Sequence, residues 1–213
     1  MTSIPKTDFK KVLKNLYVAS AAPALVDVPE LAFLAVDGVG DPDGPGYREA
    51  VEALFGVSYG VKFGLKRAGV LDYSVMPLEG LWWGAGERQD LPALDRSTWH
   101  WTMLVMQPPQ VDADLVAETV AARTRKKPSG SLERIELRNV VEGPSAQVLH
   151  VGPYREEPAT RDRLMAFVGE SGYQISGKHH EIYLSSPTRT APEKLRTILR
   201  YPVTAVSVAG GGG

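Results

Sequence analysis

The chain has 213 residues and a net charge of −1, so its overall charge does not favour binding to nucleic acid or to an anionic membrane. Hydrophobic residues make up 43% of the chain, enough for the core of one domain or one duplicated domain. Cysteine is absent, which excludes disulfides and thiolate chemistry and suits a reducing compartment. No apolar run approaches the roughly 20 residues of a membrane span, and no signal-peptide core opens the chain, so we expect a cytoplasmic protein.

The first expected elements are an N-terminal extension, residues 1–30, and a strand from Leu31 to Asp37. Within the extension, Phe9 to Tyr17 has helical spacing. A glycine-rich loop, residues 38–46, follows the strand. This loop lacks the ending and the spacing of phosphate-binding and dinucleotide-binding loops, which favours a simple turn into the next helix.

Residues 47–68 have the apolar stripe of an amphipathic helix. Three glycines, Gly56, Gly60 and Gly64, recur every four residues along it. Each costs about 1 kcal/mol of helix propensity, which indicates a packing reason. We interpret them as a smooth ridge against which a sheet packs.

The next two strands, residues 73–83 and 99–107, carry all four tryptophans and are joined by a loop, residues 84–97. Trp82 and Trp83 face opposite sides by strand parity, so at least one lies away from the helices. Two interpretations remain: ordinary core aromatics, or an aromatic-lined cavity, since ligand pockets are typically apolar with a few placed polar groups.

The second half is expected to repeat this alternation. A helix, residues 112–127, ends in a basic run that suits either a phosphate patch or, more commonly, a solvated helix end. The remaining elements are listed in chain order: strands 132–141 and 146–151, a helix 156–171, a strand 178–185, a helical turn 191–195 and a strand ending near Val203. Glycines close the chain in a flexible tail, residues 206–213.

Two segments of the chain resemble each other and indicate an internal duplication of a strand-helix-strand-strand unit. Residues 33–38 correspond to 147–152, and residues 102–108 correspond to 197–202. Such a repeat fixes architecture, and two copies can pair about a pseudo-twofold axis. The halves are expected to span residues 31–108 and 132–205, and to place Glu79 and Glu181 at related positions.

The strand at residues 178–185 carries a carboxylate between an imidazole and a phenol. Parity puts His179, Glu181 and Tyr183 on one face, and Ile182 and Leu184 on the other, where they look core-facing. A solvated strand face with an ordinary glutamate is the alternative.

Both central strands resemble the GyrI-like small-molecule-binding family. The runs that carry the resemblance are 76–83, 178–184, 192–202 and 8–11. It implies an α+β fold of tandem β-α-β-β modules, with an antiparallel sheet, helices on one face and a central ligand cleft between the halves. Some stand-alone members that resemble this chain open the cyclopropane ring of duocarmycin-like and yatakemycin-like DNA alkylators. No DNA-binding helix-turn-helix segment precedes the domain here, which departs from the regulators of the family.

The first functional hypothesis is therefore a cyclopropyl hydrolase that detoxifies aromatic DNA alkylators by water addition. Glu181 is the candidate base, since a buried glutamate with a raised pKa can serve as one, and Tyr183 is the candidate donor to the carbonyl oxygen. Candidate ligand-binding residues are Trp82, Trp83, Trp101, His179 and Tyr154. His179 and His180 point opposite ways and make a poor metal pair, so we expect no metal and no cofactor.

The second hypothesis is a non-catalytic module that sequesters aromatic or cationic small molecules through the same residues. A structural or partner-binding protein is the third, although no exposed stripe or charge patch supports it. Glu79 is open between two roles. It either pairs with Glu181 across one shared site, as an acid and base, or only fixes the loop near Gly80 and Trp82.

Overall fold

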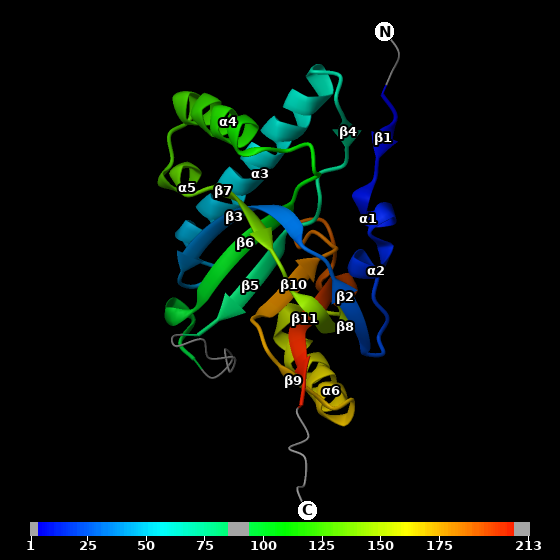
Figure 1. Cartoon of the computed structure of the whole chain (residues 1–213). Helices are drawn as coiled ribbons and strands as arrows, with labels where there is room; N and C mark the ends of the chain where they lie inside the picture. The colour runs from blue at the N-terminus through cyan, green and yellow to red at the C-terminus, as the bar shows by residue number, and fades with distance from the viewer. Residues whose placement is uncertain (1–3, 85–93, 207–213) are drawn as a thin grey trace, which may run out of the picture.

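A computed structural model describes residues 4–84 and 94–206, and the molecule is built around one large sheet (Figure 1). The strands of this sheet are β2 (Ala24–Val28), β3 (Leu31–Val39), β5 (Glu79–Trp83), β6 (His100–Met106), β7 (Glu136–Val140), β8 (Gly143–Val151), β9 (Tyr173–Ile175), β10 (His179–Tyr183) and β11 (Arg196–Ala205). Their order is β2-β8-β11-β10-β5-β6-β3-β7, with β9 paired to β11, and all neighbours are antiparallel. A small parallel pair joins β1 (Lys6–Thr7) to β4 (Asp72–Tyr73).

The helices are α1 (Phe9–Val12), α2 (Lys14–Tyr17), α3 (Pro45–Arg67), α4 (Ala113–Lys126), α5 (Gly130–Glu133) and α6 (Glu157–Glu170), with short 3₁₀ turns η3 (Arg96–Thr98), η4 (Tyr154–Glu156) and η5 (Pro192–Lys194). Local signals set several of their starts. Pro45 opens α3 with a ring already suited to a first turn, and the Asp112 side chain caps α4 by accepting from the Leu115 amide at 2.8 Å. None of the helices among the described residues is long and apolar enough to cross a membrane.

The duplication is confirmed in the strand order. One unit is β3-α3-β5-β6 and the other is β8-α6-β10-β11. In the sheet they appear as β8-β11-β10 beside β5-β6-β3, so the pseudo-twofold relation runs between β5 and β10. The predicted α+β fold with tandem modules and an antiparallel sheet is therefore correct. Figure 1 shows α3 and α4 at one end of the molecule and α6 at the other.

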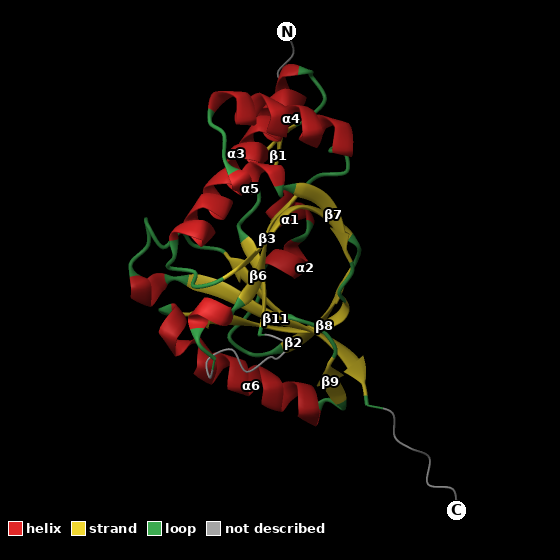
Figure 2. Ribbon diagram, turned by 90° about the vertical axis from the view of Figure 1, so that its left-hand side faces the viewer, coloured by secondary structure: helices red, strands yellow, loops and turns green. Residues whose placement is uncertain are grey.

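The register of the central strands decides which side chains share a face of the sheet. Directly paired residues point to the same side. Glu181 pairs with Gly80, and the next position along pairs Ile182 with Glu79. Glu181 therefore lies on the side covered by α3 and α6, here called the helix face, and Glu79 lies on the side covered by α1 and α2, here called the N-terminal face (Figure 2).

Apolar packing fills both faces. Ile182 is fully buried on the N-terminal face, as predicted, in the main core with Leu16 and Tyr17 of α2. The helix face holds the α3 side of the main core and a smaller cluster beneath α6 that includes Leu164 and Leu199. The central strands are thus covered from both sides, although some of their side chains, including Glu181, stay partly exposed.

Several sequence-based boundaries are wrong. The expected strand 73–83 is two strands, β4 and β5, and the expected strand 132–141 begins as helix α5. The expected N-terminal extension, residues 1–30, also contains β2, which pairs with β8 at the edge of the sheet. Of the expected loop 84–97, residues 85–93 lie outside the described residues, as do residues 207–213 of the expected tail.

The three spaced glycines of α3 face another helix rather than the sheet. A Cβ at Gly56 would lie 2.5 Å from the Arg123 guanidinium, and one at Gly60 would lie 2.5 Å from a methyl group of Thr119. Both neighbours belong to α4, so the glycines let α4 approach α3 closely. The sequence indicated a ridge but could not show which element covers it.

Candidate functional site

Glu181 lies near the centre of the helix face with partners from its own strand. Its Oε1 atom is 2.9 Å from His179 Nε2, and its side chain is 14% exposed. The Tyr183 hydroxyl also lies within hydrogen-bonding reach of it. These contacts agree with the parity prediction that His179, Glu181 and Tyr183 share one face.

Aromatic rings from both halves surround this carboxylate. Tyr47, at the start of α3, stacks on Trp82 at 5.9 Å between ring centroids and meets Trp101 edge-on at 5.4 Å. Tyr154, in η4 just before α6, meets Tyr183 edge-on at 6.0 Å. The negative charge of Glu181 acts on Tyr47 and Tyr154, so the starts of both long helices border the site.

The Tyr183 hydroxyl is held from two sides. It accepts a hydrogen bond of 3.0 Å from Trp82 Nε1 and interacts with Glu181. Burial, together with the charge of Glu181, raises the pKa of Tyr183 well above its usual value. This phenol therefore stays neutral and keeps its proton directed at the carboxylate.

Gly80 makes room for this arrangement. It stands directly opposite Glu181 in the sheet. A Cβ at Gly80 would lie 2.7 Å from Trp82 Nε1 and 3.2 Å from the Tyr183 hydroxyl oxygen. Any larger residue would push apart the hydrogen bond between Trp82 and Tyr183.

A second carboxyl group, Glu157, reaches Glu181 from the first residue of α6. It is within hydrogen-bonding reach of Glu181 and of the Thr197 hydroxyl. Its Oε1 atom is buried and has no hydrogen-bond partner in the described part of the chain. Burial and the adjacent charge of Glu181 raise the pKa of Glu157 to about 10, so Glu157 holds a proton at neutral pH.

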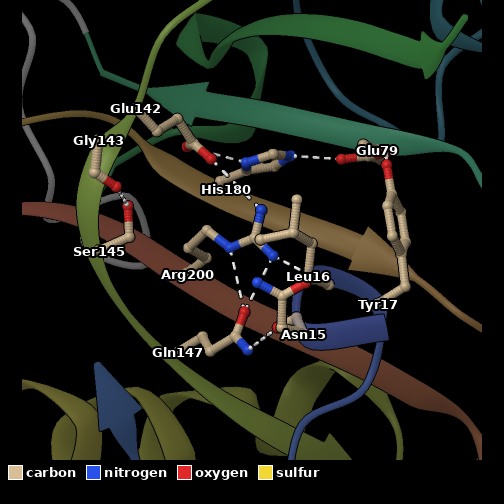
Figure 3. A network of polar contacts seen from close by, with 10 residues as sticks. All are labelled: Asn15, Leu16, Tyr17, Glu79, Glu142, Gly143, Ser145, Gln147, His180 and Arg200. Atoms are coloured by element: carbon tan, nitrogen blue, oxygen red, sulfur yellow. Dashed lines mark hydrogen bonds and ion pairs between the residues drawn. The ribbon is translucent and has the colours of Figure 1, made fainter. Parts of the chain in front are cut away.

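Glu79 belongs to a different cluster, on the N-terminal face (Figure 3). It accepts a 2.7 Å hydrogen bond from the Tyr17 hydroxyl, and its Oε2 atom is 3.0 Å from His180 Nε2. The other ring nitrogen of His180 is 2.9 Å from Glu142, which also pairs with Arg200 at 3.3 Å. Glu79 is 1% exposed and lies on the face opposite Glu181, so of its two open roles the one in which it shares a site with Glu181 is wrong.

The charges of this second cluster are mutually compensating. Burial alone would raise the pKa of Glu142, but His180 and Arg200 outweigh it and hold that pKa at about 2. Burial alone would lower the pKa of His180, but Glu142 and Glu79 raise it to about 9. Arg200 donates to the Leu16 carbonyl oxygen at 2.6 Å and Gln147 to that of Asn15 at 3.0 Å, which ties the N-terminal segment to the sheet.

The predicted ligand-binding residues divide between the two faces. Trp82, Trp101, His179 and Tyr154 lie around Glu181. Trp83 lies on the N-terminal face, stacked on His100 at 5.7 Å with Lys178 Nζ 3.4 Å from its ring centroid. Trp101 is 2% exposed beneath Tyr47, so it supports the site from below and has little surface to offer a ligand.

Sequence reasoning missed Glu157 and Tyr47. Both stand at helix starts, and nothing in their local pattern separates them from ordinary first-turn residues. The available signal was the duplication itself, which relates α3 to α6 and so brings the starts of both helices to the same region. Among residues 4–84 and 94–206, no group of three or more acidic and histidine side chains is arranged to hold a metal ion.

Comparison with known proteins shows the family of the chain. The GyrI-like small molecule binding domain family matches residues 21–204. The chain belongs to the GyrI-like family. The chain is also similar to solved structures. A conserved protein from Listeria innocua is 39% identical to it and has a TM-score of 0.85, and the match covers 92% of this chain and 99% of that one.

Two further Listeria innocua structures are described as hydrolases. One is 38% identical to this GyrI-like chain with a TM-score of 0.85, covering 94% of this chain and all of the other. The second is 37% identical with a TM-score of 0.82, covering 92% and 99%. A search of curated proteins finds no match. The relatives that share more than a third of their residues with this chain thus include proteins described as hydrolases.

Proposed function

We propose that this GyrI-like domain is a hydrolase that adds water to the strained cyclopropane ring of flat, aromatic DNA alkylators. One observation carries the proposal: a partly exposed carboxylate, Glu181, is fixed by His179 and Tyr183 among aromatic rings supplied by both halves. Two relatives described as hydrolases support the general reaction class. The cyclopropane substrate is our own inference from the resemblance to stand-alone family members.

Glu181 is assigned the role of general base. A water molecule attacks the cyclopropane methylene carbon and gives a proton to the Glu181 carboxylate. The carbon–carbon bond to the ring carbon breaks, and its electron pair enters the conjugated dienone to give a phenolate. General bases contribute typically 10²- to 10⁴-fold to a rate, so Glu181 has to supply an effect of that order.

The aromatic side chains are assigned to substrate binding. Trp82 and Tyr47 form a stacked pair beside the carboxylate, and Tyr154 lies across from them at η4 with 39% of its surface exposed. Offset and edge-on contacts between rings favour a flat aromatic ligand by about 0.5–1.5 kcal/mol each beyond burial. Tyr183 directs its hydroxyl proton to Glu181, so we assign it to holding the base rather than to donating to the substrate.

The product of such a reaction no longer alkylates DNA, so the activity would protect the cell, and we place it in the cytoplasm. The substrate is then a small aromatic molecule, and neither nucleic acid nor a membrane takes part in the reaction.

Mass spectrometry of a recovered ligand tests the proposal. Purified protein is incubated with a duocarmycin-type spirocyclopropyl dienone, and the recovered compound is examined for the gain of one water. We expect catalytic conversion by the wild type and loss of at least about 10²-fold in Glu181→Gln. Binding of the intact compound with no gain of water in the wild type would overturn the hydrolase and leave sequestration as the function.

A further inference from the structure

The hydrolysis described above produces a phenolate and needs a proton for it, and the side chains around Glu181 differ in their ability to provide one. Tyr183 accepts from Trp82 and directs its own proton to Glu181. His179 Nε2 also faces Glu181, at 2.9 Å. Both side chains therefore direct their protons to Glu181, and neither is free to protonate the phenolate.

Glu157 differs from these donors because it lies against another carboxyl group. Two carboxylates are acceptors only, so two carboxyl groups within hydrogen-bonding reach of each other repel unless one of them carries a proton. His179 contacts Glu181 and the Tyr183 hydroxyl lies within hydrogen-bonding reach of it, whereas one donor, the Thr197 hydroxyl, lies within reach of Glu157. The shared proton is better placed on Glu157, which has fewer donors to stabilise a negative charge.

The surroundings of Glu157 favour the same assignment. Its Oε1 atom is buried without a partner within residues 4–84 and 94–206, and an ionised oxygen in that position would carry a large desolvation cost. The first turn of α6 favours negative charge there, but only by about 0.3–1 kcal/mol. Burial together with the charge of Glu181 outweighs it and raises the pKa of Glu157 to about 10.

We propose that Glu157 is a second catalytic carboxyl group, which gives the substrate oxygen its proton while Glu181 takes one from water. This proposal rests on the hydrolase function above. In this proposal Glu157 gives its proton to the developing phenolate directly or through one water molecule. The reaction leaves Glu181 protonated and Glu157 ionised. Because the two carboxyl groups are within hydrogen-bonding reach, one proton transfer from Glu181 to Glu157 restores the starting state.

The interaction between Glu157 and Glu181 determines when the proton is transferred. While Glu181 is negative, its charge helps to keep the proton on Glu157. Once the proton of the attacking water neutralises Glu181, that repulsion disappears and Glu157 becomes a stronger acid. The donor is thus strengthened at the moment when negative charge develops on the substrate.

The pair titrates among several other groups, which matter for any pH profile. They are His179 and Tyr183 on β10, Tyr47 on α3, Tyr154 on η4, Arg161 on α6 and Tyr201 on β11. Burial raises the pKa of each of the four tyrosines above its usual value, so these phenols are neutral across the neutral range.

Infrared spectroscopy of the unliganded protein tests the protonation state without any substrate. We expect a protonated carboxyl C=O band at pH 7.5 that is lost in Glu157→Gln and kept in Glu156→Gln, a matched change at the neighbouring exposed residue. In Glu181→Gln the neighbouring charge is gone, so the band should titrate away at lower pH than in the wild type. If no such band exists at neutral pH, or if it survives Glu157→Gln, the proposal is wrong.

Kinetics on the spirocyclopropyl dienone test the catalytic role. Glu157→Gln should lower kcat by about 10²-fold with little change in KM, and should remove the fall in activity that we expect of the wild type as pH approaches 10. Glu157→Asp should recover part of kcat. Full kcat and an unchanged pH profile in Glu157→Gln would reduce Glu157 to a structural residue. A wild type that adds no water would instead refute the hydrolase function, while the infrared band would still decide where the proton lies.

Discussion

Glu79 and Glu181 stand on neighbouring strands of one sheet, one residue out of register, and that single step puts them in opposite surroundings. On the N-terminal face, Glu79 is 1% exposed and bound by Tyr17 and His180. On the helix face, Glu181 keeps 14% of its side chain exposed and lies against a second, protonated carboxyl group. The comparison teaches that a carboxylate whose neighbours compensate its charge holds a fold together, whereas one beside an uncompensated acid is suited to proton transfer.

The largest expected effect is a difference in folding stability between variants of Glu79 and variants of Glu181. Glu79→Ala leaves His180 buried with one carboxylate fewer, and breaking a buried ion pair costs about 3–5 kcal/mol. Glu181→Gln should change stability by less than about 1 kcal/mol, because Gln keeps the shape and a hydrogen-bonding oxygen. Chemical denaturation measures both, with the exposed Glu118→Ala as the control. Equal losses in both variants would contradict the division of roles.

The pH dependence of stability also separates the two faces, because Glu157 on the helix face and His180 on the N-terminal face change their protonation over different pH ranges. Glu157 ionises near 4.5 when unfolded but keeps its proton to about 10 when folded, so its contribution is lost as pH rises between these values. His180 behaves likewise between 6.5 and about 9. As pH rises between its unfolded and its folded pKa, each group reduces the free energy of unfolding by up to about 1.4 kcal/mol per pH unit.

Denaturation curves recorded from pH 4.5 to 9.5 distinguish these contributions. Glu157→Gln should flatten the fall between pH 4.5 and 6.5, where His180 is charged in both states. His180→Gln should reduce the slope only above pH 6.5. A slope below pH 6.5 that survives Glu157→Gln would show that Glu157 is ionised in the folded protein.

Sequence patterns predicted which side chains of a single strand share a face, but they missed which side chains of two neighbouring strands do. The alternation along residues 179–183 correctly grouped His179, Glu181 and Tyr183, because parity is a property of one strand. It could not relate Glu79 to Glu181, because the register between β5 and β10 is set by distant contacts across the sheet.

The same limit explains the other differences. The duplicated unit was visible because whole segments repeat, and the fold followed from it. Glu157 was invisible because only the packing of α6 brings a first-turn glutamate to β10. The N-terminal segment was also undervalued, since its hydrogen bonds to Arg200 and Gln147 join parts of the chain more than 130 residues apart.

A smaller effect is expected at the glycine opposite Glu181. Gly80→Ala places a methyl group 2.7 Å from Trp82 Nε1, which should break its hydrogen bond to Tyr183 and tilt the phenol that holds the base. We expect about a tenfold loss of kcat/KM on the spirocyclopropyl dienone, since the bond is worth about 1 kcal/mol and misplacement adds to it. Gly169→Ala, in α6 with nothing within 4 Å of the added carbon, is the control. Unchanged kinetics in Gly80→Ala would mean that the Trp82–Tyr183 contact does not position Glu181.

The smallest effect compares two adjacent tryptophans that strand parity sends to opposite faces. Trp82 lies on the helix face, stacked with Tyr47 and edge-on to Trp99, whereas Trp83 lies on the N-terminal face beside His100. The ring-opened product of the spirocyclopropyl dienone is a non-reacting probe whose binding can be followed by quenching of tryptophan fluorescence. Trp82→Phe should weaken this binding about fivefold, which corresponds to roughly 1 kcal/mol of aromatic contact, and should reduce the quenching. Trp83→Phe should leave the affinity and the quenching of the remaining tryptophans unchanged, because no part of its ring reaches the Glu181 side of the sheet. A stronger response to Trp83→Phe than to Trp82→Phe would place the ligand on the N-terminal face and move the functional site away from Glu181.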